Sequence, residues 1–306
     1  MRSPTQRRLD RRTIDDLLAT ALGTPVTEAA ELSGGGFAAV WRAGLADGRT
    51  VVLKVGPPAD ARLLRYERDL ILAEARYFRM VRDVAPVPEV LHAGDDWLVT
   101  TLLPGRPLTE VPGSAAVREE LGRTIAEVHT IKGDFFGYAG ERPAGGDWPE
   151  AFTAIIDALL ADAADWEVPL PPGIRDTVAR HRAALATVTV PALLHFDLWD
   201  GNVLTEGGRL TGLVDGERYL YGDPLVDLVS PALFRRIEEE PGHPFLRGYA
   251  EATGLTVDDA VRTRLTLYRT FLYLLMLAEG PSRGIPVGGE RHTSLTELLQ
   301  DELKRL

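Results

Sequence analysis

The sequence predicts an α+β protein of two lobes, a small antiparallel-sheet N-terminal lobe with one long helix and a larger, mainly helical C-terminal lobe. Three observations lead to this prediction. Short apolar runs separated by glycine turns dominate the first hundred residues. Helical patterns dominate from residue 115 onward. Between them "PGRP" interrupts both patterns, so we predict lobes at 1–103 and 104–306 with a hinge at about 100–106.

The elements of the first lobe follow from its turns. "AELSGGGFAAVWRAG" (30–44) predicts two strands around a glycine turn, and a hairpin at Asp47-Gly48 leads to a third strand that ends near Lys54. Residues 61–82 contain neither Gly nor Pro and predict the long helix. Two further strands are predicted in "PEVLHAG" and "DWLVTTLL".

The second lobe is predicted to be helical on both sides of one hairpin. Helices are expected over 115–131, 148–163 and 173–188, and again from Pro224 onward. The last helix is expected to begin at Ser294, where Ser294 and Glu297 have the spacing of a capping box.

Composition narrows the class of protein. The chain has 306 residues, 45% of them hydrophobic and 26% charged, as in an ordinary globular protein. It has no cysteine, which excludes disulfides, thiolate chemistry and cysteine-based zinc sites. The first residues lack the apolar stretch of a secretory signal, and the longest apolar run, 271–278, is too short to span a bilayer. We therefore expect a cytoplasmic protein.

The charge of the chain is unevenly distributed. Net charge is −11, but the first hundred residues hold 14 basic and 14 acidic groups, so the whole excess falls in the second lobe. This argues against a nucleic-acid partner, whose phosphates need a basic surface. An acidic lobe is compatible with a cationic small molecule, or with solubility alone.

One stretch, "LLHFDLWDGNVL" (193–204), concentrates polar side chains between two apolar runs. The order His195-x-Asp197-x4-Asn202 has the spacing of the kinase catalytic loop, in which the Asp accepts the proton of a substrate hydroxyl and the Asn binds a metal. Thirteen residues after Asn202, Asp215 ends a strand. Magnesium prefers such hard oxygen ligands. We predict Asp197 as the catalytic residue and Asn202 and Asp215 as Mg²⁺ ligands; the alternative is a hairpin with turn-capping side chains.

Two upstream features favour the catalytic interpretation. Lys54 ends the apolar strand "VVLKV"; it either protects a sheet edge or contacts nucleotide phosphates while paired with a helix glutamate. Glu67 and Glu74 lie on one helix face, and their spacing leaves both open as that partner.

The segment "SGGGFAAVW" connects two strands and predicts a flap over phosphates. The flap residues expected to bind nucleotide are Ser33, Gly34, Gly35, Gly36 and Phe37.

Together these segments, with "WLVTTLLPGRPL" and "YGDPLVDLV", resemble the aminoglycoside phosphotransferase family, the protein-kinase-like small-molecule kinases that include choline, fructosamine and antibiotic kinases. The resemblance implies a two-lobed protein-kinase-like fold. It favours Glu74 as the partner of Lys54, and it implies that backbone groups near Thr101 and Leu102 hold the adenine. It also implies that His195 and Asp227 support the catalytic loop.

The chain departs from the family pattern at two places. Phe196 stands where members often have Gly, and "WDGN" and "FFGY" resemble the fructosamine-kinase branch. These departures concern the acceptor and leave the reaction unchanged.

The predicted function is Mg²⁺-dependent transfer of the γ-phosphoryl group of ATP or GTP to a hydroxyl of a small, polar, cationic acceptor, with an antibiotic or amino sugar as first choice. Asp200 and Glu217 flank the catalytic groups and, with Asp197 and Trp199, are expected to bind the acceptor. A metabolic fructosamine or sugar kinase is the alternative enzyme, and a nucleotide-binding pseudokinase the alternative of another class. We expect a monomer or homodimer with neither nucleic-acid nor membrane partners.

Overall fold

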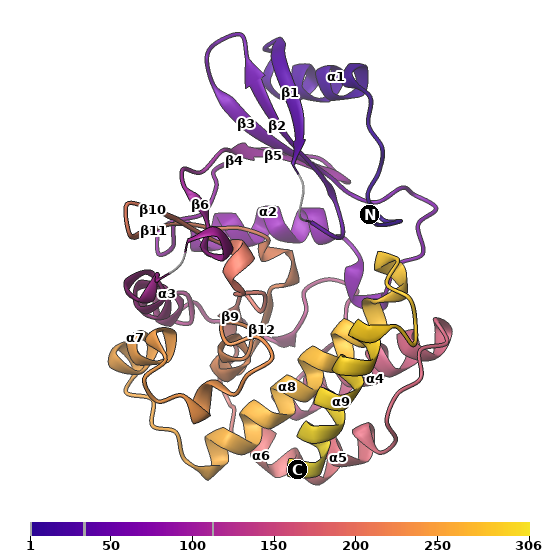
Figure 1. Cartoon of the computed structure of the whole chain (residues 1–306), viewed down its shortest axis with the longest axis vertical. Helices are drawn as coiled ribbons and strands as arrows, with labels where there is room; N and C mark the ends of the chain where they lie inside the picture. The colour runs from indigo at the N-terminus through magenta and orange to yellow at the C-terminus, as the bar shows by residue number, and fades with distance from the viewer. Residues whose placement is uncertain (1, 33–34, 112) are drawn as a thin grey trace.

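The computed structural model describes residues 2–32, 35–111 and 113–306, which form two lobes (Figure 1). The predicted α+β class is confirmed. The smaller lobe is built on an antiparallel sheet with strand order β1-β2-β3-β5-β4. Its strands are β1 (Val26–Leu32), β2 (Ala39–Leu45), β3 (Thr50–Val55), β4 (Val90–Ala93) and β5 (Trp97–Thr101).

A helix that the sequence analysis did not predict, α1 (Arg11–Leu22), covers one face of this sheet. The Asp10 side chain caps it by accepting the backbone N–H of Thr13 at 2.8 Å. Its buried Ile14 and Leu18 pack in a core with sheet residues such as Leu53. The other face of the sheet packs against α2 (Leu70–Val81), which lies between the sheet and the larger lobe in Figure 1.

The long helix predicted over 61–82 is shorter than expected. A 3-10 turn, η1 (Arg65–Glu67), precedes α2, and Asp69 separates them with a left-handed φ of 56°. The helix is shorter than predicted because contacts with the C-terminal lobe hold this turn. The Tyr66 hydroxyl donates to Glu279 at 2.8 Å, and Glu67 forms an ion pair with Arg283.

The larger lobe is mainly helical, as predicted. Its helices are α3 (Ala115–Val128), α4 (Trp148–Asp165), α5 (Ile174–Arg180), α6 (Arg182–Leu185), α7 (Pro244–Thr253), α8 (Asp259–Glu279) and α9 (Glu290–Arg305). Two expectations are corrected. The helix predicted over 173–188 breaks at His181 into α5 and α6. The last helix begins before Ser294, because its hydrogen bonding extends back to Gly289, whose carbonyl accepts the N–H of Thr293.

The longest of these helices, α8, contains the longest apolar run of the sequence. It is nevertheless not uniformly apolar, since Arg269 lies buried in it and pairs with Glu238 at 2.6 Å. Among the described residues, no helix has both the length and the hydropathy needed to cross a bilayer.

Short strands between the helices position the catalytic loop. β9 (Ala192–Leu194) and β12 (Leu220–Gly222) pair with each other, and β12 also pairs with β7 (Phe136–Gly137), which pairs with β8 (Ala144–Gly145). The hairpin of β10 (Val203–Glu206) and β11 (Arg209–Leu213) pairs with β6 (Arg106–Pro107). Because β5 ends at Thr101 in one lobe and β6 begins at Arg106 in the other, the chain crosses between lobes over these few residues.

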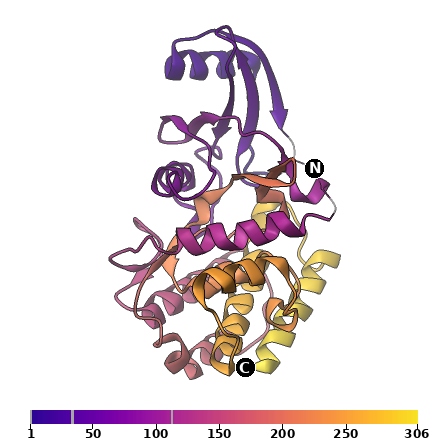
Figure 2. The same cartoon turned by 90° about the vertical axis from the view of Figure 1, so that its left-hand side faces the viewer.

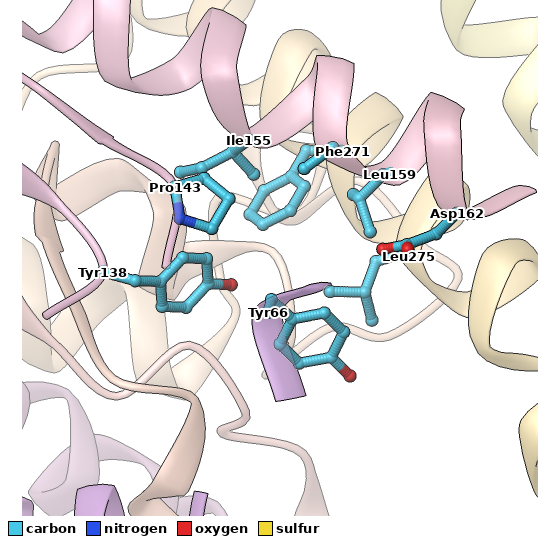
Figure 3. A pocket seen from close by; sticks show the side chains of 9 residues that line it. Tyr66, Tyr138, Pro143, Ile155, Leu159, Asp162, Phe271 and Leu275 are labelled. Atoms are coloured by element: carbon cyan, nitrogen blue, oxygen red, sulfur yellow. The ribbon is translucent and has the colours of Figure 1, made fainter. Parts of the chain in front are cut away.

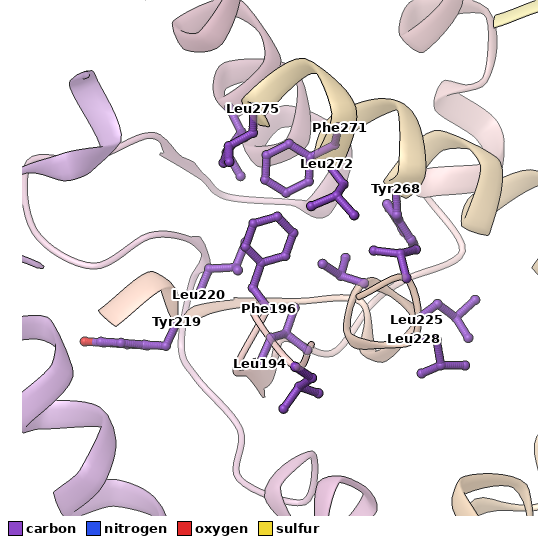
Figure 4. Close-up of a cluster of buried hydrophobic side chains, with 14 of the residues drawn as sticks. Leu194, Phe196, Tyr219, Leu220, Leu225, Leu228, Tyr268, Phe271, Leu272 and Leu275 are labelled. Carbon is purple, nitrogen blue, oxygen red and sulfur yellow. The ribbon is translucent and has the colours of Figure 1, made fainter. Parts of the chain in front are cut away.

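The base of the catalytic loop is anchored in the core of the larger lobe (Figure 4). Phe196 is buried and stacks on Phe271 of α8, with ring centroids 4.7 Å apart. Its φ is 73°, in the left-handed region that favours glycine. Here the packing of the ring compensates for the backbone strain.

We expect Phe196→Ala to lower the free energy of unfolding by about 3–5 kcal/mol, because it removes the ring and keeps the unfavourable backbone. Phe234→Ala is the matched control, since Phe234 also has a left-handed φ but its side chain is 47% exposed. Urea unfolding of both variants measures the difference. Equal losses in the two would contradict the anchoring role of Phe196.

The two lobes are joined by Tyr66, which enters a hollow of the larger lobe (Figure 3). The ring stacks on Tyr138 with centroids 6.1 Å apart, and Ile155, Leu159 and Phe271 line the rest. The hollow has no space for a water molecule. It is therefore a packed contact between the two lobes.

Candidate active site

The loop that carries Asp197 runs from β9 to a 3-10 turn, η3 (Asp200–Asn202), and buried hydrogen bonds fix it. The carboxylate of Asp227 accepts the backbone N–H of His195 at 2.9 Å and that of Phe196 at 2.6 Å. The Ser230 hydroxyl accepts the N–H of Leu198 at 2.9 Å. The bonds of Asp227 are those of a residue that supports the loop.

His195 is fully buried and also bonds within the loop. Its Nε2 lies 3.1 Å from the carbonyl oxygen of Val214, and its Nδ1 accepts the N–H of Asp197 at 3.3 Å. Burial lowers the pKa of His195, so the ring is neutral near pH 7. With both nitrogens facing the backbone, His195 orients the loop and does not face the cleft.

Lys54 lies at the centre of a cluster of carboxylates. Its Nζ is 2.7 Å from Glu74, 2.8 Å from Asp215 and 3.4 Å from Glu217. The alternative partner, Glu67, is bound by Arg283 instead. The structure therefore places Glu74, and not Glu67, beside Lys54.

The charges in this cluster act in both directions, because burial raises the pKa of Glu74 to about 8 while Lys54 favours its ionised form. Burial alone would lower the pKa of Lys54, but Asp215, Glu217 and Glu74 raise it well above its usual value. Burial opposes ionisation of Asp215, yet Lys54 lowers the pKa of that carboxyl. Lys54 is therefore charged and Asp215 ionised near neutral pH.

Hard oxygen atoms converge at this place, as a magnesium site requires. Glu74, Asp215 and Glu217 each offer a carboxylate oxygen, and the three oxygens lie within 4.8 Å of one another. Asn202 is close by, since its carbonyl accepts the N–H of Val214 at 3.1 Å. Its Nδ2 donates to the carbonyl of Asp197 at 2.9 Å, and its Oδ1 is the side-chain atom that can accept or coordinate. These donors fit Mg²⁺.

The conformation of Asp215 is also unusual. Its φ is 58°, a left-handed value for a residue with a side chain, and 38% of that side chain is exposed. Strained backbone of this kind persists where the surroundings hold it, and it is frequent at functional sites. Asp215 thus combines a fixed position with access to the cleft.

Asp197 has a cationic neighbour that the sequence analysis missed. The Arg218 Nε lies 3.8 Å from the Asp197 carboxylate and has no hydrogen-bond acceptor among the described residues. Burial raises the pKa of Asp197 to about 6, although Arg218 opposes this shift. The only sequence signal for Arg218 is a basic residue directly after "DGE" in an acidic lobe.

Arg218 belongs to a chain of ion pairs that reaches the other lobe. It lies 3.1 Å from Glu279, which lies 3.6 Å from Arg283, which in turn pairs with Glu67. None of these four residues except Glu67 was singled out from the sequence. Glu279 and Arg283 are four residues apart, but Glu67 and Arg218 are distant from them in the chain, so spacing gave no indication of the whole network.

The glycine flap is described only from Gly35 onward; Ser33 and Gly34, also predicted to bind nucleotide, lie outside the described residues. Residues near the start of the chain brace the flap. Thr5 donates to the Gly36 carbonyl at 2.9 Å, and Gln6 donates to the Gly35 carbonyl at 2.9 Å. Phe37 packs under the guanidinium of Arg283, 5.2 Å from its ring centroid.

One of the backbone groups near the predicted adenine contacts already forms a hydrogen bond within the sheet. The N–H of Thr101 donates to the carbonyl of Glu89 at 3.0 Å, so it is committed to the sheet. The prediction that backbone groups near Thr101 and Leu102 hold the adenine therefore cannot use this N–H group. The Thr101 carbonyl and the backbone of Leu102, whose side chain is 40% exposed, are the groups left for a nucleotide.

The predicted acceptor residues differ in their surroundings. Trp199 is 38% exposed, as expected for a residue at the cleft. Asp200, however, forms an ion pair with Arg118, and Glu217 is buried against Lys54. Neither is a free negative charge facing outward, which corrects the expectation on which the cationic acceptor depended. Glu217 lies in the carboxylate cluster around Lys54 instead.

A two-lobed α+β fold with a buried lysine–glutamate pair above a fixed Asp-bearing loop is protein-kinase-like. Within that class the chain belongs to the phosphotransferase enzyme family (APH), whose family model matches residues 28–267.

Two relatives are similar to this chain. The chain is 25% identical over 240 residues to a hygromycin-B 4-O-kinase of Escherichia coli, covering 68% of this chain and 67% of that protein. It is 30% identical over 119 residues to a homoserine kinase of Gluconobacter oxydans (strain 621H), a match of only 38% of this chain and 36% of that protein.

Solved structures show the same fold. A protein from Thermobifida fusca YX-ER1, described as a candidate fructosamine-3-kinase, aligns with a TM-score of 0.72 and 25% identity, over 96% of this chain and 100% of that one. An aminoglycoside phosphotransferase APH(4)-Ia, solved with ADP and hygromycin B, aligns with a TM-score of 0.65 and 18% identity, over 95% and 98%.

Proposed function

We propose that the protein transfers the γ-phosphoryl group of ATP or GTP to a hydroxyl of a small-molecule acceptor, with Asp197 as the general base. One observation carries the proposal. Lys54, paired with Glu74, and the oxygen ligands Asp215 and Asn202 converge beside the loop that fixes Asp197. Phosphoryl transfer needs positioning and positive charge at the phosphates, and these groups supply both.

Each residue has a part in this reaction. Lys54 binds nucleotide phosphates and Glu74 holds it in place. Asn202, Asp215 and Glu217 would hold Mg²⁺, which when bound supplies the charge that neutralises the phosphate oxygens. Asp197 orients the acceptor hydroxyl and takes its proton.

Removing a metal ligand should weaken binding of the Mg²⁺–nucleotide complex. We expect Asp215→Ala and Asn202→Ala each to raise the Mg²⁺ concentration needed for half-saturation by about tenfold or more, because each removes a hard oxygen. Titration of Mg²⁺ against a fluorescent nucleotide measures this. Asp157→Ala, at an exposed ion pair with Arg175, is the control. Unchanged metal dependence in both variants would place the metal elsewhere.

The pKa of Asp197 predicts the pH dependence of the reaction. The carboxylate must be ionised to accept a proton, so kcat/KM should fall as pH decreases through about 6. Arg218 lowers this pKa, so Arg218→Gln should move the acid limb to higher pH. A pH profile at saturating Mg²⁺–ATP measures both. If Arg218→Gln leaves the pH of the acid limb unchanged, the acid limb does not report the ionisation of Asp197.

The acceptor class is the finer part of the proposal. The hygromycin kinase among the relatives favours an antibiotic or amino-sugar acceptor. The fructosamine-kinase likeness, which spans 96% of the chain, favours a fructosamine or related sugar. A cationic acceptor has less support than the sequence suggested, because Asp200 and Glu217 are both paired.

ADP release from Mg²⁺–ATP over a panel of aminoglycosides, peptide antibiotics, nucleosides, sugars and fructosamines tests the proposal. We expect one class to stimulate release, with one phosphoryl group gained by the acceptor in mass spectrometry. Nucleotide binding without stimulation by any class would favour the pseudokinase alternative.

A further inference from the structure

The segment that precedes α1 reaches the glycine flap and binds it; we call residues 2–7 the strap. Figure 2 shows that the chain begins at the end of the small sheet nearest the larger lobe, whereas α1 lies at the far end. Thr5 of the strap is only 2% exposed although its side chain is polar. A buried hydroxyl needs hydrogen-bond partners, and one partner of Thr5 belongs to the flap.

The strap binds carbonyl groups of the flap. The Thr5 hydroxyl donates to the Gly36 carbonyl at 2.9 Å. The Gln6 side-chain amide donates to the Gly35 carbonyl at 2.9 Å. In a trans peptide the N–H group points away from the carbonyl oxygen of the preceding residue. The N–H groups of Gly36 and Phe37 therefore point away from the strap.

The strap and Lys54 lie on opposite faces of the small sheet. Arg2 of the strap forms an ion pair with Glu31 at 2.6 Å. Glu31 is in register with Trp41, and Trp41 with Leu53, which packs in the core beside α1, so these side chains share the α1 face. Lys54 follows Leu53 and points to the other face. Flap groups that point away from the strap are therefore directed to the side of Lys54.

The two N–H groups are available to a ligand. Gly35 and Gly36 are exposed, and neither the Gly36 N–H nor the Phe37 N–H donates to another of the described residues. Successive free N–H groups of a loop bind anionic oxygen atoms. Nucleotide phosphates, which Lys54 is proposed to bind, carry such oxygens.

Further contacts hold the strap itself in place. The guanidinium of Arg2 also donates to the carbonyl of Arg7 at 2.6 Å, and Arg7 binds Asp96 of the β4–β5 turn at 2.7 Å. Pro4 meets the larger lobe, because a Cβ on Gly284 would lie 3.4 Å from the Pro4 Cδ. A segment anchored in this way can keep the flap peptides in one orientation.

We propose that Thr5 and Gln6 are positioning residues for the nucleotide, because they turn the N–H groups of the flap toward its phosphate oxygens. This inference rests on the proposed function and adds the residues that prepare its phosphate site. Without the two side chains the flap peptides can rotate, so nucleotide binding must also order them, which weakens affinity. The base and ribose do not use these N–H groups, so adenosine affinity should not depend on the strap.

Isothermal titration calorimetry with Mg²⁺–ATP and with adenosine tests this role. Thr5→Val removes the hydroxyl with little change of shape, and Gln6→Met removes the amide without adding charge. We expect each variant to raise the Kd of Mg²⁺–ATP about tenfold and to leave the Kd of adenosine unchanged. Thr5→Ser keeps the hydroxyl and should retain wild-type affinity. If GTP binds more tightly than ATP, GTP and guanosine take their place.

Thr27→Val is the matched control, because the Thr27 hydroxyl donates to the Gly44 carbonyl at 3.0 Å in the same sheet but outside the flap. It should change neither affinity. Gln6 is only partly buried, so Gln6→Met should fold even if Thr5→Val does not.

Two results would overturn the inference. The first is unchanged Mg²⁺–ATP affinity in the folded strap variants. The second is an equal loss of affinity for Mg²⁺–ATP and adenosine, which would mean that the strap only supports the lobe. Both are measured against nucleotide binding by the wild type and need no turnover, so failure of the strap and failure of the kinase reaction are distinguishable.

Discussion

Replacing Asp197 with Asn is expected to lower kcat by about 10²–10⁴-fold while nucleotide affinity stays near the wild-type value. The amide keeps the size of the side chain but cannot accept the proton of the acceptor hydroxyl. The surrounding loop should remain in place, because Asp227, Ser230 and His195 fix its backbone independently of the Asp197 side chain. Steady-state kinetics with the identified acceptor, alongside a nucleotide-binding titration, measure both quantities.

The matched control is Asp157→Asn, which makes the same change at an exposed ion pair outside the cleft. It should leave kcat unchanged. If Asp197→Asn keeps more than about a tenth of wild-type kcat, Asp197 is not the general base.

Lys54→Met should have the second large effect, because it leaves Glu74, Asp215 and Glu217 together without their cation. Breaking a buried ion pair from one side costs about 3–5 kcal/mol, since the remaining charge is uncompensated. We therefore expect a marked loss of unfolding free energy together with a loss of nucleotide affinity. The double variant Lys54→Met/Glu74→Gln should be less destabilised than the sum of its single variants.

Glu67→Gln provides the comparison for this double-mutant cycle of Lys54 and Glu74. Glu67 is as buried as Glu74 but pairs with Arg283, so its effect should add to that of Lys54→Met. Urea unfolding of the single and double variants gives both coupling energies. Additive losses for Lys54 and Glu74, or a larger coupling to Glu67, would reassign the partner.

The parts of the site that sequence predicted are those encoded by local spacing. His195, Asp197 and Asn202 fall within eight residues, and the hairpin after them returns the chain to Asp215. A tight loop followed by a short hairpin allows few arrangements, so the spacing was informative. Glu74 was predicted only with the help of the family resemblance, because Glu67 lies on the same helical face.

The parts that sequence did not predict depend on distant contacts. The helix expected over 61–82 gives way to a turn where Tyr66 and Glu67 bind Glu279 and Arg283, more than two hundred residues later. Arg218 reaches Asp197 through the same network. Local propensity does not contain such information.

Helix α1 is a different case, because its signal was present in the sequence. Ile14, Leu17, Leu18 and Ala21 have helical spacing after the capping residue Asp10. The prediction of a cationic acceptor depended on information of another kind. Counting carboxylates gives the net charge of a lobe, but whether Asp200 or Glu217 is neutralised depends on a partner that only the fold brings near.

The central claim is that a phosphoryl group moves from nucleotide to an acceptor hydroxyl at Asp197. The most direct measurement is transfer of label from γ-labelled ATP, with Mg²⁺ present, followed on the acceptor and in free inorganic phosphate. We predict label on a hydroxyl of the acceptor with the wild-type protein and almost none with Asp197→Asn. Label found only in inorganic phosphate, or equal labelling of the acceptor by both proteins, would contradict the account.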